Sequence, residues 1–150
     1  MMTTEHERTL ASILDAIIPP RDDGALPGAG TLGLAAHIAR EVERAPELEF
    51  VVAPGIAAAD ALATERHGRH FADLAHGEQL EVLHALDGTH PAFVGTLVFH
   101  AYIGYYQHPR IRAALGLEAR PPHPSGYAMA PNDLSLLDAV RARGRLYRDG

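Results

Sequence analysis

The chain has 150 residues, a length that fits one domain with a sizeable hydrophobic core. Ala and Leu carry most of its 47% hydrophobic residues, and this composition favours helices over strands. The formal net charge of −6 offers no general attraction to phosphate backbones, so we expect no nucleic-acid partner.

The amino terminus, residues 1–8, has no cationic stretch followed by an apolar run, so it does not predict a secretory signal. We therefore expect a cytoplasmic protein as encoded, periplasmic only if a signal-bearing partner exports it. No window approaches 18 apolar residues, which predicts no direct membrane insertion. The chain has no cysteine, so it relies on neither disulfides nor thiolate metal sites.

The first predicted helix covers residues 4–18. Thr4 and Glu7 are spaced as a capping box, and apolar residues then recur at helical spacing as far as Pro19. Residues 19–30 are rich in Pro, Asp and Gly and predict a loop of turns.

Four further helices follow in chain order, over residues 31–44, 54–68, 76–87 and 91–106. Pro54 suits the first position of the third helix, because its missing N–H costs nothing there. The helix over 91–106 is apolar on most sides, which is typical of a central helix surrounded by neighbours. Its apolar residues are Phe93, Val94, Leu97, Val98, Ala101 and Tyr102.

A short helical turn is expected over residues 111–115, and a last helix begins after Asn132 or Asp133 as its cap. No run alternates β-branched and polar residues, so a sheet is not predicted. The expected fold is an all-α, single-domain bundle of about six helices over residues 1–150, with an extended Pro-rich carboxy-terminal segment.

Ten histidines raise the question of a metal site. Three pairs have suggestive spacing: His67 with His70, His84 with His90, and His108 with His123. A site needs further ligands, and the sequence offers neither HExxH nor facing Glu-x-x-His motifs. We therefore expect no metal ligands, and we read His100, alone on an apolar helix, as a core or interface residue.

Asp15, Asp22 and Asp23 lie around the 19–30 loop and could act as a general acid and base. Turn chemistry explains them more simply, because Asp side chains cap backbone amides in such loops. We expect no catalytic residues in this chain.

The segment 104–131 gathers Tyr and Pro residues where a helical core does not need them, and it predicts a contact surface. Tyr offers a large contact area with a polar tip at low entropic cost. The basic carboxy-terminal tail adds arginines that suit an acidic surface. The predicted partner-interface residues are Tyr102, Tyr105, Tyr106, His108, Pro109, Pro121, Pro122, Tyr127, Arg141 and Arg143.

Several blocks in this order resemble the family of gluconate 2-dehydrogenase subunit 3, the small or gamma subunit. The blocks are Leu14-Asp15-Ala16-Ile17-Ile18-Pro19-Pro20, the link from Gly28 to Gly33, Phe71-Ala72-Asp73-Leu74, Gly104-Tyr105-Tyr106-Gln107-His108-Pro109, Arg120-Pro121-Pro122 and Gly126-Tyr127. Family members often carry a twin-arginine signal, which this chain lacks.

The resemblance implies a non-catalytic small subunit or maturation factor that binds a large FAD-dependent dehydrogenase of the glucose-methanol-choline type. That partner would oxidise sugars, sugar acids or related alcohols, and it would hold the FAD, so this chain would bind no cofactor. A cytochrome c subunit often completes such complexes. Two alternatives stay open: a stand-alone metal protein or enzyme using His100, His108 and His67 or His70, and a self-associating helical scaffold.

Overall fold

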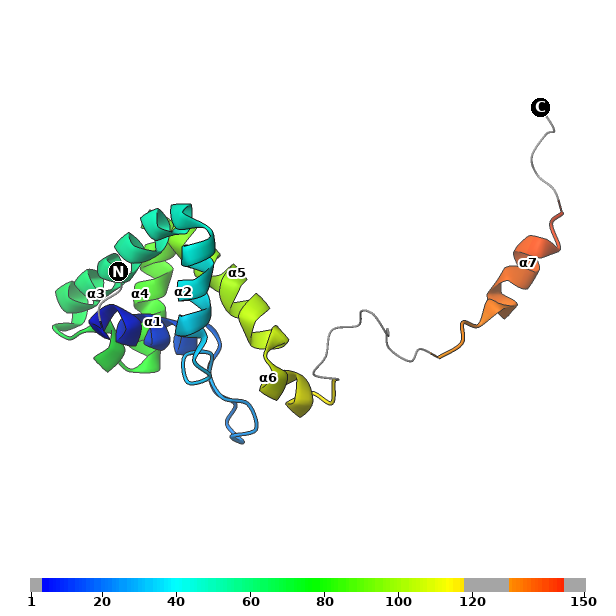
Figure 1. Cartoon of the computed structure of the whole chain (residues 1–150), viewed down its shortest axis with the longest axis horizontal. Coiled ribbons are helices and arrows are strands. Elements are labelled where there is room, and N and C mark those ends of the chain that lie inside the picture. Colours follow the sequence, from blue (N-terminus) through cyan, green and yellow to red (C-terminus); the bar gives the residue numbers. More distant parts are fainter. Residues whose placement is uncertain (1–3, 118–129, 145–150) are drawn as a thin grey trace, which may run out of the picture. The chain divides into compact units, whose positions relative to one another are not determined.

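The structure is a computed structural model that describes residues 4–117 and 130–144. Its contacts divide the chain into two compact units, residues 1–119 and 120–150. The described part of the first unit holds α1 (Thr4–Ile17), α2 (Leu34–Arg44), η1 (Pro46–Leu48), α3 (Glu49–His67), η2 (Phe71–Asp73), α4 (His76–Thr89), α5 (Pro91–Gln107) and α6 (Pro109–Ala114) (Figure 1). The second holds η3 (Leu134–Leu137) and α7 (Asp138–Arg141). Neither described range contains a strand, and the all-α prediction is confirmed.

Most predicted helices lie within a few residues of their expected bounds, and α3 is the clearest exception. It begins at Glu49, so Pro54 lies inside the helix and not at its first position. Val52, in the first turn, is only 2% exposed, and its burial favours extending the helix upstream of the proline. Pro54 has no N–H to donate to the Phe50 carbonyl. Residues 50 and 54 are both exposed, so water can bond to that carbonyl instead.

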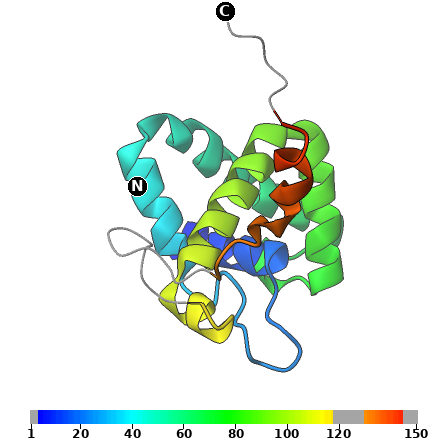
Figure 2. The same ribbon diagram turned by 90° about the vertical axis from the view of Figure 1, so that its right-hand side faces the viewer.

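α5 contacts each of the other helices of the first unit. Figure 2 shows it, in yellow-green, between α2 in cyan and α4 in green. Its buried residues are Phe93, Leu97, Ala101, Gly104 and Tyr105. These positions share one side of the helix, which places the hydrophobic core on that side of α5.

The core continues through α1, α3 and α4. Its fully buried large side chains include Leu10, Ile13 and Leu14 of α1, Ile56 of α3, Phe71 of η2, and Val82 and Leu86 of α4. Over the described ranges, no helix combines the length and apolar character needed to cross a membrane.

The loop between α1 and α2 projects from the helices (Figure 1). Backbone hydrogen bonds close it at two levels: Ala29 N–H donates to the Ile18 carbonyl at 3.0 Å, and Arg21 N–H donates to the Leu26 carbonyl at 2.9 Å. The predicted loop of turns is therefore an ordered element. α2 begins later than expected, after Gly33, whose φ of 88° is a conformation that favours glycine.

Candidate partner-binding surface

α5 is apolar on nearly all sides, but the other helices of the first unit pack against only one side of it. The opposite side exposes Val98, Phe99, Tyr102 and Tyr106, at 38%, 60%, 48% and 51% of their surfaces. We call these four residues the α5 aromatic face. They recur at three- and four-residue spacing, so they form one stripe along the helix. A contiguous exposed apolar patch of this kind commonly marks a protein–protein contact site.

Two aromatic rings of this face lie close to each other. The ring centroids of Tyr102 and Tyr106 lie 6.0 Å apart, and Tyr106 meets Tyr105 edge-on at 5.4 Å. Beside the face, a hollow of about 430 Å³ opens between the end of α1, α4 and α5. It is lined by Ala16, Ile17, Leu80, Leu83, His84, Asp87, Val94, Gly95, Val98 and Tyr102. Stripe and hollow together suit an inserted apolar side chain of a partner.

Tyr105, one of the predicted interface residues, is buried in the structure. Its side chain is only 2% exposed, and its hydroxyl donates to the Pro27 carbonyl oxygen at 2.8 Å. Burial raises the pKa of the Tyr105 hydroxyl, so it stays a neutral donor. Because successive helical residues point about 100° apart, Tyr105 faces the core while Tyr106 faces outward. In the folded first unit Tyr105 fastens the 19–30 loop to α5.

Asp15 in α1 binds Thr31, the residue that directly follows the same loop. Its carboxylate accepts from the Thr31 N–H and from the Thr31 hydroxyl, each at 3.0 Å. Gly30 lies so close to α1 that a Cβ there would collide with the Ala11 carbonyl oxygen. In the loop itself Asp23 accepts from the Ala25 N–H at 2.9 Å, and this bond lowers the pKa of the Asp23 carboxyl. The structure therefore supports the turn-chemistry reading of Asp15 and Asp23.

Gly104, in the same block as Tyr105, serves the packing of α2 on α5. A Cβ at this position would lie 2.6 Å from Cδ2 of His37, so any side chain there would force the His37 ring to shift. Burial lowers the pKa of the His37 imidazole, so the ring packs on the glycine in its neutral form. Gly104 and Tyr105 therefore contribute to packing inside the first unit.

The remaining predicted interface residues are scattered. His108 caps α6 by accepting from the Arg110 N–H at 3.2 Å, and Pro109 is the first residue of that helix. Arg141 and Arg143 are exposed in the second unit, where Arg141 donates to Asp138 at 3.1 Å. Pro121, Pro122 and Tyr127 lie outside the described residues. Of the predicted interface residues that the structure describes, Tyr102 and Tyr106 lie on the exposed side of α5, and Val98 and Phe99 share that side.

A signal for Phe99 was present in the sequence. Once Phe93, Leu97 and Ala101 are assigned to the core, Phe99 falls on the opposite side of the same helix. A large apolar residue there is not explained by core packing and indicates a contact surface.

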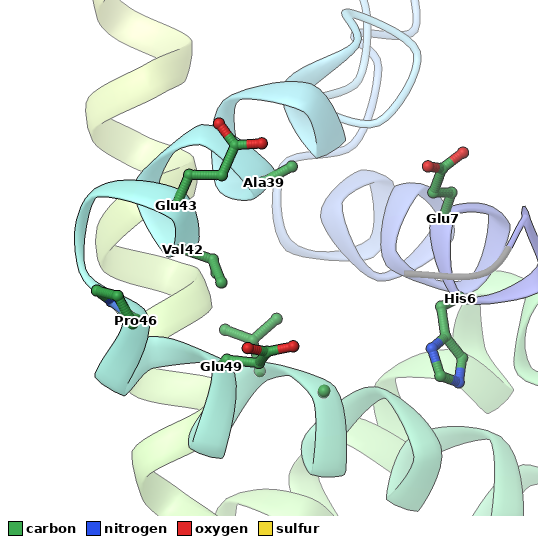
Figure 3. A pocket seen from close by; sticks show the side chains of 9 residues that line it. His6, Glu7, Ala39, Val42, Glu43, Pro46 and Glu49 are labelled. Carbon is green, nitrogen blue, oxygen red and sulfur yellow. The ribbon is translucent and has the colours of Figure 1, made fainter. Parts of the chain in front are cut away.

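A second hollow, of about 500 Å³, opens between α1, α2, η1 and α3 (Figure 3). Its apolar part comes from Ala39, Val42, Pro46, Val52 and Ala53, and its polar part from His6, Glu7, Glu43 and Glu49. Three carboxylates around one opening repel negative charge. This hollow therefore disfavours an anionic ligand such as a flavin dinucleotide.

His123 lies outside the described residues, and neither His67 with His70 nor His84 with His90 forms a shared metal-binding group among the described ones. His67 Nδ1 lies 3.6 Å from Glu78, whereas His70 Nδ1 lies 2.7 Å from Asp60 Oδ2. The hydrogen bond and charge of Asp60 raise the pKa of His70. Within ranges 4–117 and 130–144, the one group that could hold a metal ion is Glu5, Asp60 and His70.

The family model for gluconate 2-dehydrogenase subunit 3 matches residues 4–117. The chain belongs to this family. The match covers the described part of the first unit and ends before Arg120, so the Arg-Pro-Pro and Gly-Tyr blocks lie outside it. No curated protein and no solved structure matches the chain.

Membership of this family indicates that the chain is a subunit of a larger complex. The family is a subunit of gluconate 2-dehydrogenase, so the chain is a small subunit of the type found in dehydrogenase complexes. Several residues of the blocks that carried the resemblance have internal roles. Asp15, Gly30, Gly104 and Tyr105 all anchor the 19–30 loop or pack helices together.

Proposed function

We propose that this chain is a non-catalytic subunit that binds and stabilises a large FAD-dependent dehydrogenase of the glucose-methanol-choline type, and that the α5 aromatic face is its docking surface. The observation that carries the proposal is the open apolar side of α5 in a member of a dehydrogenase-subunit family. The flavin and the catalytic groups belong to the partner, which oxidises sugars, sugar acids or related alcohols. The acidic hollow supports this division, because its charge disfavours a dinucleotide.

The size and chemistry of the face suit a protein partner. One Phe, two Tyr and one Val side chain lie on a single rigid helix, so little conformational entropy is lost when they are covered. Aromatic residues of this kind supply most of the binding energy in well-packed interfaces. A partner present at 100 times its dissociation constant stabilises the bound fold by about 2.7 kcal/mol, enough to rescue a marginal apo-enzyme.

Co-expression tests the proposal. A large FAD-dependent dehydrogenase from the same genome is produced with and without this chain, and soluble yield, bound flavin and co-purification are measured. We expect all three to require the chain. A dehydrogenase that is equally soluble and flavin-loaded alone, and that does not co-purify with the chain, contradicts the proposal.

A further inference from the structure

We propose that Glu5, Asp60 and His70 form a zinc-binding site that joins α1, α3 and the turn before η2. The three side chains each present one ligand atom, and these atoms all lie within 4.8 Å of one another. Glu5 is far in the sequence from Asp60 and His70, so the packing of α1 brings it to the other two side chains.

The distances fit a tetrahedral ion. A zinc ion with bonds of about 2.0–2.1 Å holds neighbouring ligand atoms about 3.3 Å apart. His70 Nδ1 lies 2.7 Å from Asp60 Oδ2 and 3.5 Å from Glu5 Oε1, which brackets that spacing. The Glu5 and Asp60 ligand atoms lie within 4.8 Å of each other, and rotation of the exposed Glu5 side chain can adjust that spacing.

A protonated His70 can pair with both carboxylates, but it balances only one of their two negative charges. The Nδ1 atom of an imidazole carries at most one proton, and Asp60 is placed to accept it. Glu5 then approaches the same nitrogen at 3.5 Å without a hydrogen of its own, beside a second negative carboxylate. A divalent cation satisfies all three groups and balances the two carboxylate charges with a neutral imidazole.

The central ligand is already oriented by the core. Asp60 Oδ1 accepts from the Phe71 N–H at 2.9 Å, and Phe71 is fully buried, so the second oxygen is fixed toward His70. Hydrogen bonds of this kind orient the ligands of metal sites. The presence of an imidazole ligand favours zinc over magnesium or calcium, which prefer oxygen ligands. Water can take the fourth position, because Glu5 and His70 are exposed.

Calorimetric titration of the full chain, stripped with a chelator, with zinc chloride tests this site. We expect one zinc per chain, at least tenfold weaker binding in His70→Ala, Asp60→Asn and Glu5→Gln, and no comparable heat with magnesium chloride. Glu5 is 65% exposed on its side chain, so Glu5→Gln leaves the fold intact. His84→Ala, which removes an exposed histidine elsewhere, is the matched control and should bind as the wild type does.

Because the site joins three elements, zinc should also raise the melting temperature of the wild type and of His84→Ala, but not of Glu5→Gln. The inference is overturned if the wild type binds no stoichiometric zinc. It is equally overturned if the three ligand variants keep wild-type affinity, since zinc would then bind other histidines.

Discussion

Replacing Phe99 by alanine should weaken the complex with the dehydrogenase without weakening the chain itself. The side chain is 60% exposed, so of the roughly 200 Å² that a Phe offers, about 120 Å² is open to a partner. At about 25 cal/mol per Å², covering that area is worth about 3 kcal/mol. Because interfaces seldom realise the full value, we expect a loss of about 1.5–3 kcal/mol, or about 10- to 150-fold in Kd.

Phe50 provides a matched control for this measurement. It is 84% exposed, more than Phe99, but it lies on α3, outside the α5 aromatic face. Phe50→Ala therefore removes the same atoms from a different surface. Both variants should keep the wild-type free energy of unfolding within about 0.5 kcal/mol, because neither side chain is buried.

Affinity is measured by titrating each purified variant into the flavin-loaded dehydrogenase and recording the heat of binding. We expect Phe99→Ala to bind at least tenfold more weakly than the wild type and Phe50→Ala to bind like it. Equal Kd values for the two variants would refute the assignment of the α5 aromatic face as the docking surface.

Three further predictions concern the fold that presents this face. Tyr105→Phe leaves a buried carbonyl without its donor and should lower the free energy of unfolding by about 1–2 kcal/mol in urea titrations, and no change would show that the hydroxyl bond is unimportant. Gly104→Ala should cost about 1–3 kcal/mol because the new methyl meets the His37 ring, and adding His37→Ala should recover part of that loss, whereas additive losses would deny the contact. The Ala75 N–H and Arg69 lower the pKa of Glu78, so its stabilisation is present above the unfolded pKa of about 4.5 and is lost as the pH falls through the lower folded value. Glu78→Gln should therefore unfold more readily than the wild type at pH 7, with the difference shrinking below about pH 4.5, and a pH-independent difference would contradict this.

The helices could be predicted because their apolar residues recur at helical spacing, but the sequence could not orient α5. With apolar residues on nearly every side, its pattern does not distinguish the covered side from the open one. Tyr105 and Tyr106 are the same residue type in adjacent positions, yet one is buried and the other is exposed. Only the packing of α2, α3 and α4 decides between them.

Pairings between distant residues were also beyond the sequence. Asp15 could be assigned to turn chemistry, but not to Thr31, which lies 16 residues away. His70 was considered with His67, its neighbour in sequence, whereas its contacts are Asp60 and Glu5 on other helices. The start of α3 was misplaced for a related reason, because a local proline signal was outweighed by the burial of Val52.

A photo-crosslinking amino acid placed at a single position tests the central claim most directly. The chain is co-expressed with the dehydrogenase, carrying the crosslinker in place of Phe99 in one sample and of Phe50 in another, two exposed positions on different helices. We predict that irradiation joins the chain to the flavoprotein from position 99 and not from position 50. Crosslinking from position 50 alone, or from neither position in a complex that co-purifies, would contradict the claim that the α5 aromatic face binds the enzyme.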